Sequence, residues 1–278
     1  MDKPLVTIGV CSKTRVPKET LQSIFNQTYR PFEVIVVLHG EEQRDKYVPG
    51  CRTFFEKRGL GMARQIVVEN AYGKYIAWVD DDHVLPADYL ACQVEFMEKH
   101  PDTAAGQSYV AAHPQAKIFG KIEAAVWRVY TRRISSTTDV PVGSAGVIYR
   151  TDALREVGGY DVDCKGACED GDVCLRLLKA GWKLRVNPNC FYYAFKDESL
   201  HRLWYRSTWY GRGARWLNKK YSRQIVNVFR HVPPIAFVAA LRHLVPLSKE
   251  IPLHLCLLHP FLYSLKGAAW IWGYYFQK

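Results

Sequence analysis

Three consecutive carboxylates, Asp80, Asp81 and Asp82, end a short apolar run that begins at Tyr75. An unbroken apolar run predicts a strand buried on both faces, so the acids would emerge at the carboxyl edge of a sheet, where open α/β sheets bind ligands. Adjacent acids repel one another, and a cation would relieve this repulsion. Mg²⁺ and Mn²⁺ prefer oxygen ligands and often share carboxylates with phosphates. The run indicates a metal–phosphate site, although a solvated acidic turn before a helix would have the same pattern.

A second acidic cluster, Glu169, Asp170 and Asp172, precedes a predicted helix. Asp170 lies one turn before the apolar position Val173, so it would project from the start of the inward face. An acid at this place can cap the helix and interact favourably with its positive end. In a partly desolvated cleft, where burial and neighbouring acids raise the carboxyl pKa, it can also serve as a general base. The two roles are compatible.

Two loops rich in small residues could approach a ligand closely. Gly59 and Gly61 precede a helix that carries Arg64 near its start, and helix N–H groups with a guanidinium suit phosphate oxygens. The segment 140–146 is also rich in small residues. The first loop could be a plain turn with a surface arginine, and the second could equally be a tight packing crossing. The first loop, however, immediately precedes the strand that ends in the acid triplet.

The order of predicted elements is that of an α/β protein. Strand, helix and strand at the start of the chain imply a right-handed parallel crossover. We expect strands at 5–11, 32–38, 52–55, 75–79, 104–110, 147–149 and 182–186. We expect helices at 17–25, from the loop 58–64 to about 71, at 87–99 and 118–129, after the acids 169–172, and at 199–221.

Composition narrows the class of protein. The 278 residues are 48% hydrophobic and 23% charged, which is ordinary for a globular chain, but the net charge of +11 suggests polyanionic or phosphorylated partners. The eight cysteines are scattered without zinc-type spacing and suit a reduced, cytosolic setting. The N-terminus does not have the shape of a signal peptide, and no apolar stretch reaches the 18 residues of a conventional membrane span.

The region 218–278 differs from the rest of the chain. Its apolar segments are broken by prolines and flanked by basic residues, as in amphipathic helices that lie on a membrane surface. A helical pair that closes the core is an equal alternative. The aromatic cluster at Trp270, Trp272 and 274–276 favours a membrane interface, where such side chains concentrate.

In combination, these motifs resemble the family 2 glycosyltransferases over residues 5 to about 217. The resemblance rests on the ordered segments 6–10, 21–29, 61–64, 73–82, 157–161 and 169–170. It implies a GT-A fold, a Rossmann-like mixed and mostly parallel sheet flanked by helices, over residues 1–217, with a C-terminal helical extension over 218–278. It also implies inverting transfer of a sugar from a nucleotide-diphosphate donor.

Site residues follow from the same resemblance. Asp80 and Asp82 match the metal-binding DxD motif for Mn²⁺ or Mg²⁺, and Asp170 matches the general base of the ED motif. The 143–146 loop occupies the place of the donor-sugar wall. Contacts with the nucleotide sugar are expected from Lys13, Arg15, His39, Gly61, Arg64, Asp81, Ser144, Ala145 and Glu169.

Three positions depart from the family pattern. The segment 37–40 lacks the aspartate that usually reads the nucleobase, Thr14 stands where an asparagine is common, and a histidine expected near 191–195 is missing. Lys196 or His201 could take the place of that histidine. Because that aspartate is missing, the sequence does not specify the donor base.

The predicted function is metal-dependent transfer, with a UDP-sugar favoured as donor, to a hydroxyl of a glycan or a lipid-phosphate-linked acceptor. The protein would work at the cytosolic face of an anionic membrane, and no nucleic acid is expected as a partner. One rival is a nucleotidyltransferase that makes sugar nucleotides, but the segment 12–16 lacks its glycine-rich signature. The other is a non-enzymatic basic module that binds RNA or membranes, which would leave the acid triplet without a role.

Overall fold

The computed structural model describes residues 5–40, 47–143, 145–222 and 225–277. The chain forms two compact units. Unit 1 comprises Met1–Val110, Thr131–Lys165 and Glu169–Tyr193, and unit 2 comprises Ala111–Tyr130, Gly166–Cys168 and Ala194–Lys278. Every site residue predicted from the sequence belongs to unit 1. The long helix α7, which the sequence placed with the first 217 residues, groups with the C-terminal helices.

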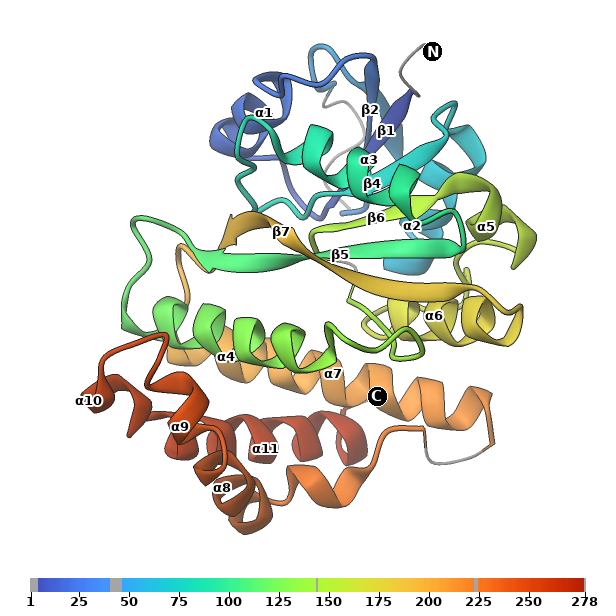
Figure 1. Ribbon diagram of the computed structural model, residues 1–278. Helices are drawn as coiled ribbons and strands as arrows, with labels where there is room; N and C mark the ends of the chain where they lie inside the picture. The colour runs from blue at the N-terminus through green and yellow to red at the C-terminus, as the bar shows by residue number, and fades with distance from the viewer. Residues whose placement is uncertain (1–4, 41–46, 144, 223–224, 278) are drawn as a thin grey trace. The chain divides into compact units, whose positions relative to one another are not determined.

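Unit 1 is built on a seven-stranded sheet with the order β3-β2-β1-β4-β6-β5-β7 (Figure 1). β1 runs parallel to β2 and β4, and β2 runs parallel to β3. β6 is antiparallel to both β4 and β5. The mixed, mostly parallel sheet is therefore confirmed. The strands are β1 Val6–Ser12, β2 Phe32–Leu38, β3 Arg52–Phe55, β4 Tyr75–Trp78, β5 Thr103–Ala112, β6 Val147–Arg150 and β7 Lys183–Ala194.

The strand before the acid triplet is buried along its whole length, as its apolar run predicts. Val6 of β1 is paired with Tyr75 of β4, and Gly9 is paired with Trp78. A Cβ atom on Gly9 would lie 2.5 Å from the Trp78 ring and 2.9 Å from Val67. Gly9 therefore leaves the space that the indole needs, and the packed indole holds the end of β4 in place.

Helices cover both faces of the sheet. The crossovers from β1 to β2 and from β3 to β4 run in opposite directions across the strand order, so right-handed connections put α1 and α2 on opposite faces. The core between α2, α5, α6 and the sheet contains Val67, Leu154, Val173 and Leu177. The helices of unit 1 are α1 Lys18–Phe25, α2 Leu60–Asn70, α3 Tyr89–Lys99, α5 Thr151–Glu156 and α6 Glu169–Lys179.

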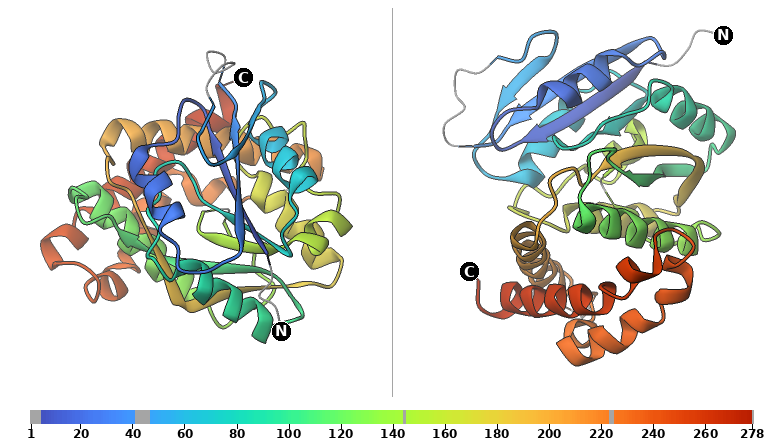
Figure 2. Two further views of the ribbon diagram at one scale, coloured as in Figure 1. Left: turned by 90° about the horizontal axis from the view of Figure 1, so that it is seen from above. Right: turned by 90° about the vertical axis from the view of Figure 1, so that its left-hand side faces the viewer.

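Unit 2 is helical. α11 packs against both α7 and α8, and the orange-to-red helices lie together in the right-hand view of Figure 2. The α7–α11 crossing is close because a Cβ on Gly211 would lie 2.0 Å from the Trp270 carbonyl oxygen, and one on Gly273 would lie 2.0 Å from that of Thr208. Its elements are most of α4 Ile118–Ile134, then α7 Leu200–Lys220, the 3₁₀ helix η1 Val228–His231, α8 Pro233–Leu241, α9 Leu244–Leu247, α10 Leu253–Cys256 and α11 His259–Tyr275.

The residues of the C-terminal aromatic cluster differ in how far they are buried. Trp270 is 6% exposed and stacks on His231 with ring centroids 3.8 Å apart, so this indole closes the core instead of facing outward. Trp272 and Phe276 remain exposed. No helix in the described part of the chain is both long and apolar enough to cross a membrane.

Candidate functional site

The acid triplet lies directly after β4, and its three carboxylates differ in environment. The side chains of Asp80 and Asp82 are 38% and 53% exposed. The Asp81 carboxylate instead accepts a hydrogen bond of 2.5 Å from Ser12 Oγ at the end of β1. Burial raises the pKa of Asp81, the Ser12 hydrogen bond opposes that rise, and the neighbouring acids add to it. Asp80 and Asp82 are thus the acids that present oxygens to solvent.

His83 orients the two outer acids. The backbone N–H of Asp80 donates to His83 Nδ1 at 3.2 Å, so Nε2 carries the proton in the neutral ring. Nε2 lies 3.7 Å from Asp80 Oδ2 and 3.6 Å from Asp82 Oδ1. The ring is buried and packs on Tyr192 with centroids 4.5 Å apart. The sequence prediction assigned His83 no role, although its place next to the triplet was the available signal.

Arg64 joins the two acidic motifs. Its guanidinium lies 3.0 Å from Glu169 and 3.4 Å from Asp80, and its side chain is 4% exposed. Its Cζ lies 4.6 Å from the centre of the Trp78 ring. Burial, reinforced by Asp170, raises the pKa of Glu169 to about 8, and the Arg64 guanidinium opposes that rise. Arg64 and Glu169, both predicted to touch the nucleotide sugar, form a buried ion pair beneath the site.

Asp170 lies beside the loop predicted to form the donor-sugar wall. Its Oδ1 accepts a hydrogen bond from the Gly171 N–H at 2.7 Å. A Cβ on Gly143 would lie 4.0 Å from Asp170 Oδ2, so the loop backbone passes close to this carboxylate. The structure therefore brings the predicted base and the predicted wall together.

The wall is anchored to β5. The Ala145 carbonyl accepts a hydrogen bond of 2.5 Å from Gln107 Nε2, and the Gly146 carbonyl accepts one of 2.6 Å from Ser108 Oγ. Gly146 has φ +62°, and a Cβ there would lie 2.1 Å from the Tyr192 ring, so the position requires glycine. Ser144, also a predicted contact, lies outside the described residues.

Three basic residues predicted to contact the nucleotide sugar, Lys13, Arg15 and His39, follow the ends of β1 and β2. Lys13 and Arg15 are exposed, and the His39 backbone N–H donates to the Ser12 carbonyl at 2.9 Å. Burial, together with the cations Lys13 and Arg64, lowers the pKa of His39 to about 4, so its ring is neutral at pH 7. A cavity of about 260 Å³ lined by Gly40, Phe55, Glu56 and Lys57 adjoins it.

Gly61 has a packing role in the structure. Its N–H donates to the Cys164 carbonyl at 2.9 Å, so this N–H is already hydrogen-bonded within the protein. A Cβ there would lie 2.2 Å from the Asp161 carbonyl oxygen. The glycine permits a close backbone crossing at the start of α2, a role that the sequence analysis did not assign to it.

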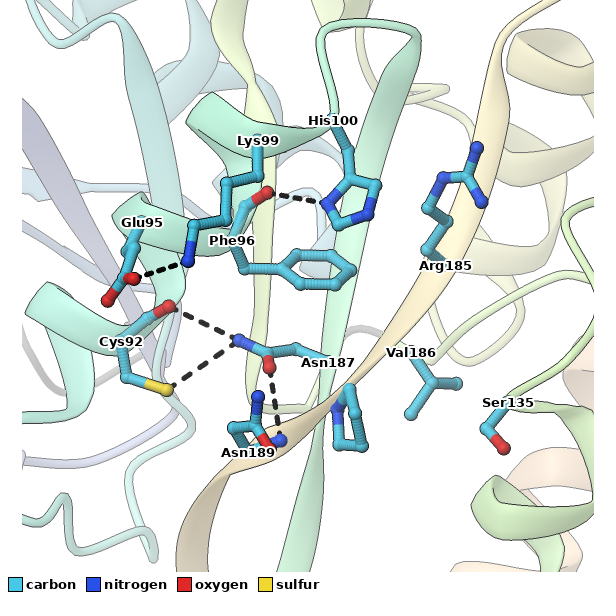
Figure 3. Close-up of a pocket in the computed structure, with 11 residues that line it drawn as sticks. Cys92, Glu95, Phe96, Lys99, His100, Ser135, Arg185, Val186, Asn187 and Asn189 are labelled. Carbon is cyan, nitrogen blue, oxygen red and sulfur yellow. Dashed lines mark hydrogen bonds and ion pairs between the residues drawn. The ribbon is translucent and has the colours of Figure 1, made fainter.

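A larger cavity, of about 370 Å³, lies between α3 and β7 (Figure 3). It contains none of the predicted site residues. Asn187, in its wall, donates to the Cys92 carbonyl at 3.3 Å and to Gln93 at 3.0 Å, and its own carbonyl accepts from the Asn189 N–H. The smaller cavity is not lined by a predicted site residue either, but Gly40 in its lining directly follows His39, so the smaller cavity is the better candidate for a ligand.

The two exposed acids fit a divalent cation. Asp80 and Asp82 direct carboxylate oxygens toward one ring nitrogen of His83, and hard cations take oxygen ligands. Among residues 5–40, 47–143, 145–222 and 225–277 there is no group of three or more His, Cys, Asp or Glu placed to hold a metal ion. Mg²⁺ is commonly held by one or two carboxylates together with substrate phosphates, so a two-carboxylate set suits a site that its ligand completes.

Solved structures share this architecture. The mannosyltransferase PcManGT of Pyrobaculum calidifontis, solved with GDP-Man and Mn²⁺, matches 96% of this chain and 74% of its own, with a TM-score of 0.56 and 18% identity. Residues 1–349 of S. aureus TarS, solved with UDP, match 97% of this chain and 88% of their own, with a TM-score of 0.51 and 17% identity. These likenesses define the class of fold, which is GT-A.

The family follows from the sequence match. The model described as glycosyl transferase family 2 matches residues 16–158, and the chain belongs to this family. The glucosyl-dolichyl phosphate glucuronosyltransferase of Haloferax volcanii is 26% identical over 245 residues, which are 73% of this chain and 72% of that protein. The chain spans only about a fifth of the length of several other curated relatives that it matches.

Proposed function

We propose that this protein transfers a sugar from a nucleotide-diphosphate donor to an acceptor hydroxyl with inversion at the anomeric carbon. The observation that carries the proposal is the Arg64 guanidinium, which lies between Asp80 of the triplet and Glu169 of the ED motif. Because Asp170 follows Glu169 directly, the contacts of Arg64 hold the acid triplet and the predicted base close together. Because the chain belongs to glycosyl transferase family 2, we assign glycosyl transfer to these residues.

Asp80 and Asp82 would hold Mg²⁺ or Mn²⁺. A bound divalent ion would supply charge to stabilise the departing diphosphate. Nε2 of His83 lies near both carboxylates, whereas Asp81 accepts its hydrogen bond from Ser12 and would contact the donor sugar or ribose. Lys13 adds positive charge at the same edge of the sheet.

Asp170 is proposed as the general base. Its carboxylate lies beside the Gly143 backbone, in the loop predicted to form the donor-sugar wall, so an acceptor hydroxyl that approaches a sugar bound against that wall would be within its reach. Asp170 would take the hydroxyl proton as the oxygen attacks the face opposite the diphosphate. A single displacement needs one such carboxylate, whereas glycoside hydrolysis uses a pair.

The donor base is proposed to occupy the cavity at the ends of β2 and β3. This cavity adjoins His39, whose neutral ring has one nitrogen to donate and one to accept a hydrogen bond. A UDP-sugar remains the favoured donor. UDP was bound in the TarS structure and GDP-Man in that of PcManGT, so both bases belong in the test.

The acceptor is proposed to be a glycan or a lipid-phosphate-linked molecule reached from the cytosolic side of a membrane. The name of the Haloferax relative describes a glucosyl-dolichyl phosphate as the molecule on which that enzyme acts. The net charge of +11 suits a phosphorylated acceptor at an anionic surface.

A thermal-shift panel of UDP-, GDP- and dTDP-sugars, with and without Mn²⁺, tests the donor site. We expect one base to raise the melting temperature, and to do so more with the metal present. The Asp170→Asn variant should keep that shift while losing release of the nucleotide diphosphate in the presence of acceptor. No shift with any donor, or normal transfer by Asp170→Asn, would reject the corresponding part of the proposal. Pyrophosphate release from a nucleoside triphosphate would point to the rival nucleotidyltransferase.

A further inference from the structure

The short helices α8 to α10 are apolar on both faces. Their inner faces pack on unit 2: Leu247 and Cys256 contact Ala125 of α4, and Leu255 contacts Ile122. Ala236 and Ala240 of α8 are also buried. A surface helix of a globular protein normally has a polar outer face, so these helices differ from that pattern.

Their outer faces also carry large apolar side chains. Val245 is 72% exposed and Leu253 63%, and Phe261 in the first turn of α11 is 66% exposed. Figure 1 shows α8, α9 and α10 close together near the start of α11. The outer apolar surface comprises Ile235, Val238, Leu241, Val245, Leu253, Leu257, Leu258 and Phe261. So many exposed large apolar side chains on neighbouring short helices are typical of protein or membrane interaction sites.

The charges around this surface are of one sign. Arg230, Arg242 and Lys249 are exposed, whereas Glu250, the one acid in residues 225–277, is 6% exposed and pairs with Arg128 at 3.0 Å. Lys266 is also neutralised, because it donates to the buried Glu123 at 2.8 and 2.9 Å. The exposed rim in this part of the structure is therefore cationic around an apolar centre.

We propose that the outer apolar surface docks on the surface of an anionic lipid bilayer, inserting its aliphatic and Phe261 side chains among the lipids. Arg230, Arg242 and Lys249 would contact lipid phosphates. An apolar centre with a basic rim is the composition of interfacial membrane-binding segments. A protein partner with the same apolar chemistry would not require a rim of one sign. The inference is independent of sugar transfer, and it places the contact on α8–α10 and the first turn of α11 instead of on the Trp270 end of α11.

Flotation of the full chain with vesicles of phosphatidylcholine alone, or with added phosphatidylglycerol, tests the docking. We expect binding to the anionic vesicles that falls with salt. The triple variant Val245→Ser, Leu253→Ser and Phe261→Ser should bind at least about tenfold more weakly. Arg242→Gln and Lys249→Gln should each cost about fivefold on anionic vesicles only.

Tyr47→Ser is the matched control, because Tyr47 is 69% exposed and belongs to unit 1. All the replaced side chains are exposed, so circular dichroism should show an unchanged fold. Absence of binding by the parent chain, or equal binding by the triple variant and the parent, would overturn the proposal. Light scattering that shows a dimer of the parent and a monomer of the triple variant, without vesicle binding, would assign the surface to a second copy of the chain and would also overturn it.

Discussion

Replacing Arg64 with Met should destabilise unit 1 strongly, because the variant leaves a buried acid without its cation. At 3.0 Å and an effective dielectric constant of ~20, the Arg64–Glu169 attraction is about 5.5 kcal/mol before desolvation is counted. Removing one partner of a buried pair typically costs about 3–5 kcal/mol. We therefore expect Arg64→Met to lower the free energy of unfolding by about 3–5 kcal/mol at pH 9, which is above the pKa of about 8 of Glu169, so the acid is ionised in the parent.

A double-mutant cycle separates this charge effect from packing. Adding Glu169→Gln to Arg64→Met removes the isolated charge but keeps the shape of the side chain, so it should restore at least about 1 kcal/mol. Urea unfolding followed by both fluorescence and circular dichroism measures each free energy, and agreement of the two probes justifies a two-state fit.

Arg52→Met is the matched control, since the Arg52–Glu33 pair is partly exposed and should contribute about 1 kcal/mol or less. The reasoning fails if Arg64→Met costs no more than this control. It also fails if the two substitutions at positions 64 and 169 add without coupling, because the contact would then have no energetic weight.

Three further outcomes follow from burial and charge. Asp82→Asn should leave the free energy of unfolding within about 0.5 kcal/mol of the parent, because the side chain is exposed, yet should abolish transfer and the Mn²⁺-dependent thermal shift. Ser12→Ala removes the hydrogen bond to Asp81 and should weaken donor binding roughly tenfold by calorimetry. Burial lowers the pKa of His259 from 6.5 to about 4, so the unfolded state takes up a proton at higher pH than the folded state, and the free energy of unfolding should fall as pH drops from about 6.5 to about 4. Urea titrations should show a smaller fall for His259→Gln than for the parent, and an equal fall would contradict this.

Most of the fold could be predicted because its signals are local. The strand 32–38 and the buried strand before the triplet are visible as apolar runs, and Pro17 marks the start of α1. The direction of β6, by contrast, could not be predicted from the sequence. A run of three apolar residues has the same pattern in a parallel and an antiparallel strand, so only pairing with β4 and β5 decides it.

The site was predictable by residue type but less so by environment. Asp80 and Asp82 occupy the exposed edge that the strand pattern implies. Arg64 looks like a surface phosphate ligand in the sequence, since nothing local shows that Glu169, more than a hundred residues later, packs against it. The role of His83 is hidden for a similar reason, because it depends on the position of Tyr192 in β7.

The division between buried and exposed acids accounts for how one sheet edge can hold so much negative charge. Asp81 gives a carboxylate oxygen to Ser12, Glu169 pairs with Arg64, and Asp80 and Asp82 face the ring N–H of His83. Each fixed donor offsets part of the repulsion, yet the two outer acids stay 38% and 53% exposed and retain lone pairs for a ligand. A site organised in this way is charged before any ligand arrives. Cation binding would therefore be driven by repulsion already present in the folded chain, and Asp82→Asn should weaken it without disturbing the fold.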